Sequence, residues 1–384
     1  MLKRLDLNNF TVFERASLNF AHGLNVIVGE NGSGKSHLLK IAYSVMAASA
    51  EEGKKPTAGK PVKKHFQKSL ADKIIGVMRP EALGHLVRKN RCEVAVEFQD
   101  SRLDCSFSFS TSNKSSVQID MLPSVWLEKA PVFLPTKELM TLYPNFISLY
   151  ENHYMEFEET YRDTCRLLGA LPLKGSIETT IKGLTGPLEE AMGGVVLLDN
   201  NGRFYLDIKG KGKMEMPLVA EGLRKLAMLS RLISTGSLLG EGYLFWDKPE
   251  ADLNPRLIRL VAEVIYHLCQ HGIQVFLATH SLFLLRELER FSKEEKFSNI
   301  QPRFFALMLK EGGVEVEQCT DIEKLEEHFT YMSDGFIAYE SEEDDLDTVS
   351  STVPSYDELT VRRQRSKVLD ELVKQAQDLK MGYE

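Results

Sequence analysis

The sequence has no long apolar run and little cysteine. No stretch approaches the roughly 18 apolar residues that a membrane helix requires, and the first residues lack the apolar segment and cleavage site of a secretory signal. The five cysteines follow no C-x-x-C spacing and their number is odd, so we expect reduced thiols. These absences predict a cytoplasmic protein without a membrane segment.

Several kinds of site are missing as well. The histidines and cysteines show no metal-ligand spacing, no Ser-His-Asp order stands out, and no heptad array could form a long coiled-coil arm. The formal net charge of -8 argues against a surface that coats DNA uniformly, although a local basic patch could still bind phosphates. The 384 residues, 43% hydrophobic and 27% charged, predict a globular core with a smaller lobe.

A glycine-rich motif follows an apolar strand at 24–28 and opens a helical pattern at 38–45. It fits the G-x-x-x-x-G-K-[ST] pattern of a phosphate loop. In such a loop, backbone N–H groups cradle phosphate oxygens, Lys35 reaches the terminal phosphates and the Ser36 hydroxyl ligates Mg²⁺. The residues expected to bind ATP are Gly29, Glu30, Asn31, Gly32, Ser33, Gly34, Lys35 and Ser36.

A second group of motifs lies after residue 242. The apolar run 243–246 ends at Asp247, a carboxylate suited to orienting magnesium. A polar segment follows at 249–255, and the apolar run 274–278 then ends in Thr279, His280 and Ser281. Because a helical pattern at 255–269 separates the two runs, they predict a βαβ unit with its polar residues at the strand ends.

These pieces resemble, in order, the Walker B, D-loop and switch-histidine segments of ABC ATPases. Together with Leu-Asp-Leu-Asn-Asn-Phe at 5–10, they make the chain similar to the RecF/SMC/OLD-like branch over roughly residues 1–45 and 215–290. The resemblance implies an ATPase of bacterial genome maintenance or anti-phage defence. It also implies that Ser36 and Asp247 hold Mg²⁺ and that His280 contacts the γ-phosphate.

The resemblance further implies a head-to-tail dimer, or a higher oligomer, closed around ATP. The signature loop that would contact the partner's phosphates matches residues 219–225. Glu221 and Gly222 follow the family pattern there, whereas Ala220 replaces the usual serine. Backbone N–H groups at Gly222 and at the start of the following helix could still bind phosphate.

Lys248 departs from the family pattern, which has a glutamate directly after the Walker B aspartate to polarise the attacking water. A protonated lysine cannot act as that base. Either Glu250 supplies the carboxylate, or hydrolysis is slow and ATP serves mainly as a dimerising ligand. Glu250 and His280 are therefore the catalytic candidates. The segment 134–138 lies where a Q-loop is expected but contains no glutamine.

The whole pattern predicts an α/β P-loop fold of ABC ATPase type, with a mixed sheet, an antiparallel side layer and an inserted helical lobe. Alternating residues at 92–98, 103–109 and 117–120 predict the side layer. The expected divisions are the N-terminal core at 1–135, the helical lobe at 136–195, the C-terminal core at 196–338, and an acidic linker with a terminal helix at 339–384.

A lysine-rich insertion is expected at 50–70, with a loop over 50–68. A solvated insertion and a phosphate-contacting arm for DNA or RNA both fit its composition, and we favour the solvated insertion.

The function expected by analogy is an ATPase that dimerises on ATP and couples its nucleotide state to nucleic acid or a protein effector. An ATP-gated scaffold or sensor with little hydrolysis is an alternative that Lys248 and Ala220 support. An ATPase subunit of a transporter is a weaker one, because such subunits usually carry an intact signature and a Q-loop glutamine.

Overall fold

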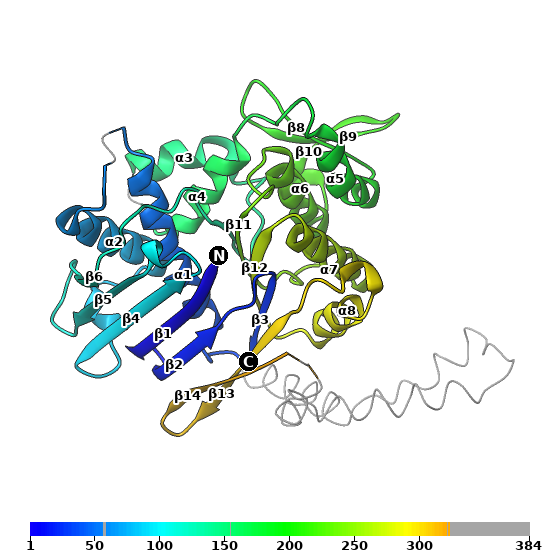
Figure 1. Cartoon of the computed structure of the whole chain (residues 1–384). Coiled ribbons are helices and arrows are strands. Elements are labelled where there is room, and N and C mark those ends of the chain that lie inside the picture. Colours follow the sequence, from blue (N-terminus) through cyan, green and yellow to red (C-terminus); the bar gives the residue numbers. More distant parts are fainter. Residues whose placement is uncertain (57–58, 154, 321, 323–384) are drawn as a thin grey trace, which may run out of the picture. The chain divides into compact units, whose positions relative to one another are not determined.

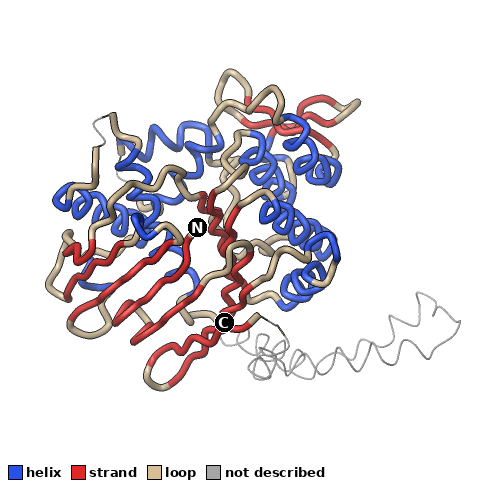
Figure 2. Tube along the Cα trace, viewed as in Figure 1, coloured by secondary structure: helices blue, strands red, loops and turns tan. Residues whose placement is uncertain are grey.

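A six-stranded sheet carries the predicted nucleotide site (Figures 1 and 2). The computed structural model describes residues 1–56, 59–153, 155–320 and 322. The strand order is β14 (Gly313–Cys319), β13 (Arg303–Lys310), β3 (Leu24–Gly29), β12 (Ile273–Thr279), β11 (Gly242–Asp247) and β7 (Val132–Leu134). All neighbours are parallel except β13 and β14. The mixed sheet and the predicted βαβ unit, with α7 (Pro255–Gln270) as its helix, are confirmed.

Every residue of β3, β11 and β12 is buried, because helices cover both faces of this sheet. α1 (Lys35–Gly53) lies on one face and α7 on the other (Figure 1), followed by α8 (Leu282–Ser292). The carboxyl ends of β3, β11 and β12 lie at the same edge, since these strands are parallel. That edge brings the phosphate loop, Asp247 and His280 together.

An antiparallel sheet forms the predicted side layer. Its order is β2 (Phe13–Asn19), β1 (Leu2–Phe10), β4 (Arg91–Phe98), β5 (Cys105–Ser110) and β6 (Gln118–Met121). Leu5 and Leu7 face the core from β1, whereas Arg4 and Asp6 face outward. The side layer is larger than predicted because the first two strands of the chain belong to it.

Helix α1 is sandwiched between the two sheets (Figure 1). Of its 19 residues, 14 are buried, including Leu38, Ile41 and Val45. The helix shares one hydrophobic core with both sheets. The phosphate loop therefore continues into one of the most deeply enclosed elements of the protein.

The predicted loop at 50–68 is wrong at both ends. Helix α1 continues to Gly53, and α2 (Lys63–Met78) begins at Lys63. Phe66, Leu70 and Ile74 recur at helical spacing and are fully buried, and Phe66 also packs edge-on against Trp126. Three of the lysines that suggested a loop, Lys63, Lys64 and Lys68, instead occupy the exposed face of a packed helix, whereas Lys54, Lys55 and Lys60 lie between α1 and α2.

The middle of the chain is helical, as predicted, and a small three-stranded sheet follows it. The helices are α3 (Tyr143–Asn152), α4 (Glu159–Leu168) and α5 (Glu178–Met192). The sheet consists of β8 (Gly194–Leu198), β9 (Phe204–Ile208) and β10 (Gly212–Glu215), and α6 (Glu221–Ser234) comes after it. Short 3-10 turns lie at Leu83–Leu86, Ser101–Leu103, Met216–Leu218 and Glu295–Phe297. The predicted acidic linker and terminal helix at 339–384 lie outside the described residues. No described helix is long and apolar enough to cross a membrane.

Candidate functional site

The phosphate loop joins β3 to α1. Gly32 and Gly34 have φ angles of +85° and +90°, a region that favours glycine. A Cβ at Gly34 would lie 2.6 Å from Val12 Cγ2 and 2.7 Å from Phe13 Cζ. Position 34 therefore requires glycine for space as well as for conformation, because the turn between β1 and β2 packs directly on the loop.

Lys35 is the first residue of α1, and its ammonium group turns back into the loop. Its Nζ donates to the carbonyl oxygens of Gly29 at 2.6 Å and Glu30 at 2.8 Å. Burial, followed by the charge of Lys248, lowers the pKa of Lys35, while Asp247 opposes this effect. The exposed residues of the loop are Glu30, Asn31 and Gly32, whereas Ser33 is buried. A charged lysine and the N-terminus of a long helix thus face one point, which suits an anionic ligand.

Ser36 and Asp247 meet at the edge of the sheet. The Ser36 hydroxyl donates to Asp247 Oδ2 at 2.6 Å, although the two residues are 211 positions apart in the chain. Asp247 ends β11 and is 8% exposed. A hydroxyl and a carboxylate in this arrangement are oxygen ligands of the kind that Mg²⁺ prefers.

Three buried polar atoms around this point have no hydrogen-bond partner in the described part of the chain. They are Ser33 Oγ, Asp247 Oδ1 and Glu250 Oε2. Buried polar groups are normally paired, so an unpaired set at one place points to a missing ligand. Two carboxylate oxygens and a hydroxyl beside Lys35 fit a phosphate group with its magnesium ion.

Glu250 and His280, the two catalytic candidates, lie side by side. Glu250 Oε1 accepts a hydrogen bond from Thr279 Oγ1 at 2.8 Å and lies 3.8 Å from His280 Nδ1. The Glu250 side chain is 9% exposed and that of His280 is 44% exposed. The carboxylate is therefore held from one side, which leaves Oε2 for another partner.

Glu221 and Gly222 begin α6, which lies against the polar segment after β11. A Cβ at Gly222 would lie 2.6 Å from the carbonyl oxygen of Asp252, so only glycine allows this close approach. Lys225, one turn further along, is buried and donates to the Ala251 carbonyl oxygen at 2.6 Å. Burial lowers the pKa of this lysine. Glu221 itself is exposed at the first turn.

The segment 134–138, where the Q-loop glutamine is missing, carries a buried ion pair instead. Glu138 Oε1 accepts from Arg224 Nε at 2.8 Å, and Oε2 accepts from the backbone N–H groups of Met140 and Thr141. The Glu138 side chain is 4% exposed and that of Arg224 is 16% exposed. This pair ties α6 to the chain that follows β7.

Sequence reasoning missed Tyr161, which α4 brings close enough to Asp247 for the charge of that carboxylate to act on it. Burial raises its pKa, and the charges of Glu158 and Asp247 raise it further. α4 is held there partly by Thr164, whose hydroxyl donates to the Phe133 carbonyl oxygen of β7 at 2.5 Å. No local motif marks such a residue, because its position depends on a contact between distant segments.

Another carboxylate cluster lies where α1, α2 and α4 meet. Glu51, Glu159 and Asp163 converge closely enough to hold a metal ion. Their shared centre is already filled by the ammonium group of Lys73, at 2.5, 2.6 and 3.1 Å. The cluster is therefore a buried ion-pair network.

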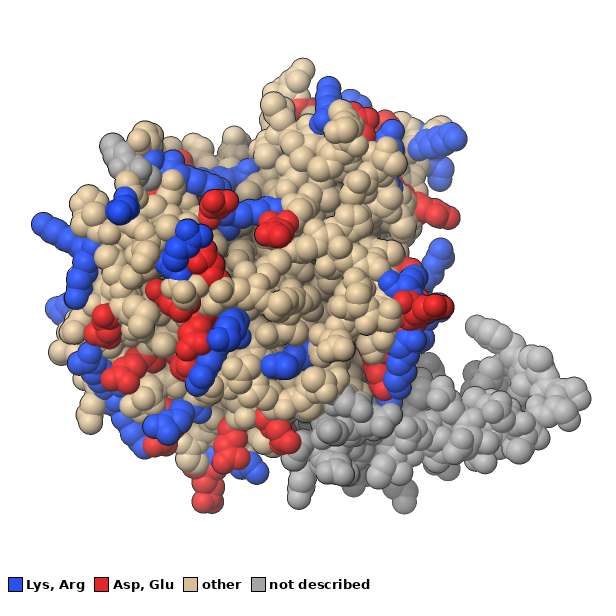
Figure 3. Space-filling model, in the orientation of Figure 1, with Lys and Arg blue, Asp and Glu red and all other residues tan. Residues whose placement is uncertain are grey.

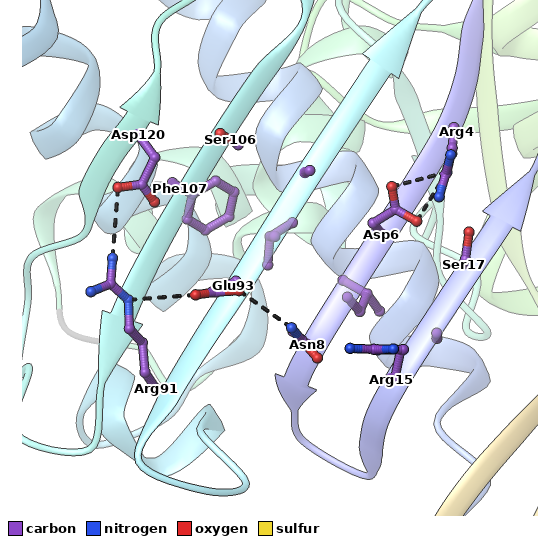
Figure 4. A pocket seen from close by; sticks show the side chains of 14 residues that line it. Arg4, Asp6, Asn8, Arg15, Ser17, Arg91, Glu93, Ser106, Phe107 and Asp120 are labelled. Atoms are coloured by element: carbon purple, nitrogen blue, oxygen red, sulfur yellow. Dashed lines mark hydrogen bonds and ion pairs between the residues drawn. The ribbon is translucent and has the colours of Figure 1, made fainter.

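A polar groove crosses the outer face of the antiparallel sheet (Figure 4). Arg4 pairs with Asp6 at 2.9 Å, and Arg91 lies 3.9 Å from Glu93 and 3.7 Å from Asp120. Because these arginines already have carboxylate neighbours, the groove does not form the uncompensated basic track that a phosphate backbone would favour.

Two family models match the sequence. The model described as "AAA domain, putative AbiEii toxin, Type IV TA system" matches residues 100–286, and one described as "AAA domain" matches residues 4–128. A comparison with curated proteins finds no significant match.

Solved structures of similar fold include SMC heads. The SmcHead bound to the C-winged helix domain of ScpA is 12% identical with a TM-score of 0.54, and the match covers 85% of this chain and 99% of that chain. The Smc head domain with an extended coiled coil, bound to the C-terminal domain of ScpA derived from Pyrococcus furiosus, is 12% identical with a TM-score of 0.50. That match covers 86% of this chain and 99% of the other.

At 12% identity these likenesses concern the fold, and they agree with the two AAA domain matches and with the phosphate loop between β3 and α1. The predicted fold class is thereby confirmed. The two AAA domain matches and the fold support a P-loop ATPase of the RecF, SMC and ABC type, as the sequence resemblance predicts.

Proposed function

We propose that this protein binds ATP with Mg²⁺ at residues 29–36 and hydrolyses it, with Glu250 as the general base. The observation that carries the proposal is the hydrogen bond between Ser36 and Asp247, beside which Asp247 Oδ1 and Glu250 Oε2 are buried and unpaired. Bound Mg²⁺ would neutralise charge on the terminal phosphates. Lys35 would bind the terminal phosphates, and Ser36 and Asp247 would hold the ion.

Glu250 is suited to the base because its two oxygens have different surroundings. Oε1 is held by Thr279, whereas Oε2 is free to accept a proton from water. Lys248, at the position usually occupied by the base, carries a positive charge and cannot take that role. His280, next to Oε1, would orient the carboxylate and contact the terminal phosphate.

ATP-dependent dimerisation is the second part of the proposal. The N-terminus of α6 has exposed Ala220 and Glu221, and Ala220 provides no side-chain cap for the helix. Its first N–H groups are therefore available to an anion. Leu218, just before it, is 74% exposed. A second copy that presents its bound nucleotide to this helix would contact the N–H groups with its phosphates and cover Leu218 with its surface. A higher oligomer could repeat the contact.

The partner that reads the nucleotide state is proposed to be a protein effector or nucleic acid, in defence against foreign DNA or genome maintenance in the cytoplasm. The toxin–antitoxin description of one matching family and the ScpA domains bound to Smc heads both favour a protein effector. Lys63, Lys64 and Lys68 are exposed on α2 and could contact phosphates. On the face shown in Figure 3, however, charges of both signs are mixed.

Steady-state ATP turnover of the purified protein, with and without duplex DNA, tests this function. We expect Mg²⁺-dependent turnover that Lys35→Ala abolishes, because this variant loses the cation that faces the phosphates. Normal ATP affinity in Lys35→Ala would refute the site. Turnover that rises with DNA would favour nucleic acid as the partner.

The second candidate is an ATP-gated scaffold or sensor with little hydrolysis. Lys248 in place of the usual base and Ala220 in place of the signature serine favour it. Tight ATP binding with turnover no higher than that of Lys35→Ala would support the scaffold over the ATPase.

A further inference from the structure

Lys248 occupies an unusual backbone position at the end of β11. It follows Asp247, the proposed magnesium ligand, and its N–H donates to the Ala278 carbonyl oxygen at 2.8 Å, which continues the contact with β12. Its φ angle is +51°, a left-handed conformation that is unfavourable for lysine and that tends to occur at functional sites. The backbone of Lys248 is thus fixed at the edge of the sheet where the proposed nucleotide site lies.

The ammonium group of Lys248 lacks an anionic partner in the described part of the chain, although the residue is half-buried. Other buried lysines in this protein are paired: Lys35 with two carbonyl oxygens, Lys225 with Ala251 and Asp252, and Lys73 with three carboxylates. Among the described lysines that are buried or half-buried, Lys248 is the one without such a partner, although pairing would be expected there.

Lys248 and Lys35 belong to one electrostatic site. Lys248 directly follows Asp247, which is bonded to Ser36 beside Lys35, and the charge of Lys248 acts on Lys35. Two positive groups near one another repel unless an anion lies close to both. Glu250 and Asp247 partly offset this charge at Lys35, but Asp247 is already engaged with Ser36.

We propose that Lys248 binds the γ-phosphate of ATP and makes the site selective for nucleoside triphosphates over diphosphates. This inference rests on the proposed ATP site. Residues 29–36 would enclose the phosphates, with Lys35 reaching the terminal ones. Asp247 ends β11, and Lys248 and Glu250 follow it, on the side where the last phosphate would be. A glutamate at position 248 would repel that phosphate, so the lysine changes the local charge by two units and gives the third phosphate a partner of its own.

Binding measurements test the proposal without depending on hydrolysis. Dissociation constants for ADP and for the non-hydrolysable β,γ-imido analogue of ATP, each with Mg²⁺, would be measured by calorimetry. Lys248→Asn removes the charge and suits the left-handed backbone, whereas Lys248→Arg keeps the charge. The control is Lys209→Asn, at an exposed position in the turn between β9 and β10.

We expect Lys248→Asn to weaken binding of the triphosphate analogue by about tenfold or more, the usual effect of losing a charge-assisted hydrogen bond. ADP binding should change by less than about threefold, because Lys35 and the loop are untouched. Lys248→Arg and Lys209→Asn should both keep the selectivity of the wild type.

Equal weakening for both nucleotides, or no change for either, would overturn the selectivity role. Thermal unfolding of each variant shows whether a loss reflects the fold, and Lys248→Gln, which also removes the charge, takes the place of Lys248→Asn if that variant is unstable. A wild-type protein that binds neither nucleotide would refute the ATP site itself. Wild-type binding that Lys35→Ala removes and Lys248→Asn leaves intact would refute only this inference.

Discussion

Glu250 illustrates how much the surroundings of one carboxylate decide. Its neighbours Thr279 and His280 hold one oxygen, while the other is buried and unpaired beside Asp247. A base two positions beyond the usual one can work if the chain turns sharply between them. Such a turn is present, since Ala251 N–H donates to the Lys248 carbonyl oxygen and Asp252 has a φ of +62°.

Glu250→Gln should lower ATP turnover by about 100-fold or more, because an amide cannot accept the proton from water. Nucleotide affinity should be preserved, since Lys35 and Ser36 are unchanged. Turnover and binding would be measured in parallel, with Glu241→Gln, exposed before β11, as the control. If turnover survives in Glu250→Gln while His280→Ala removes it, the general base is misplaced.

The residues that could be predicted from the sequence are those carried by contiguous motifs. Gly29 to Ser36 form one contiguous motif, Asp247 ends one apolar strand and His280 directly follows another, so parallel pairing necessarily brings them to one edge. Tyr161, Lys225 and the pair Glu138–Arg224 could not be predicted. The position of each depends on contacts between segments that are far apart in the chain, and neither residue spacing nor residue type indicates such a contact.

At the scale of elements, the same difference explains the error over α2. The lysine, glycine and proline residues around 53–61 favoured the prediction of a loop, although Phe66, Leu70 and Ile74 form an apolar repeat that is buried in the structure. The helix is stable because that repeat packs on α1, a tertiary effect that local composition does not report. Likewise, nothing local indicates that β1 and β2 join the side layer rather than the central sheet.

Lys73 joins α1, α2 and α4 through Glu51, Glu159 and Asp163, and this network makes a pH-dependent prediction. Burial alone would raise the pKa of Asp163, but Lys73 and Arg162 hold it below its ordinary value. A carboxyl group with a lowered pKa in the folded state stabilises the fold above the pKa of the unfolded chain, which is ~3.9. That contribution is lost as the pH falls through the folded value.

We therefore expect Lys73→Met to destabilise the fold at neutral pH, by less than the ~3–5 kcal/mol of a fully broken buried ion pair, since it removes the cation that Glu51, Glu159 and Asp163 share while Arg162 still pairs with Glu159 and Asp163. It should also move acid unfolding to a higher pH, because these carboxylates would then protonate more readily. Circular dichroism across a pH series would measure both effects, with Lys209→Met as the exposed control. An unchanged acid midpoint would show that the network contributes little.

At the scale of the whole molecule, the proposed dimerisation would complete the site from two copies. The phosphate loop, Asp247, Glu250 and His280 meet at the sheet edge, and the N-terminus of α6 has no side-chain cap. Within the chain, α6 is coupled to the nucleotide edge through Lys225, which reaches Ala251 in the segment that also carries Glu250. A second copy seated on α6 would thus connect its nucleotide to the catalytic segment of the first.

This arrangement predicts that a bulky group at the start of α6 blocks assembly but not nucleotide binding. In a Glu250→Gln background, which retains ATP, we expect the protein to form dimers or higher oligomers with ATP and Mg²⁺, as measured by light scattering after size exclusion. Glu221→Trp should leave it monomeric, because residue 221 is exposed at the helix N-terminus. ATP affinity per chain should stay within about threefold of the parent. Glu241→Trp, at the opposite end of β11 from Asp247, should still assemble.

Assembly that persists in Glu221→Trp would place the interface elsewhere. A parent protein that stays monomeric with bound ATP would remove dimerisation from the proposed function while leaving the ATP site intact.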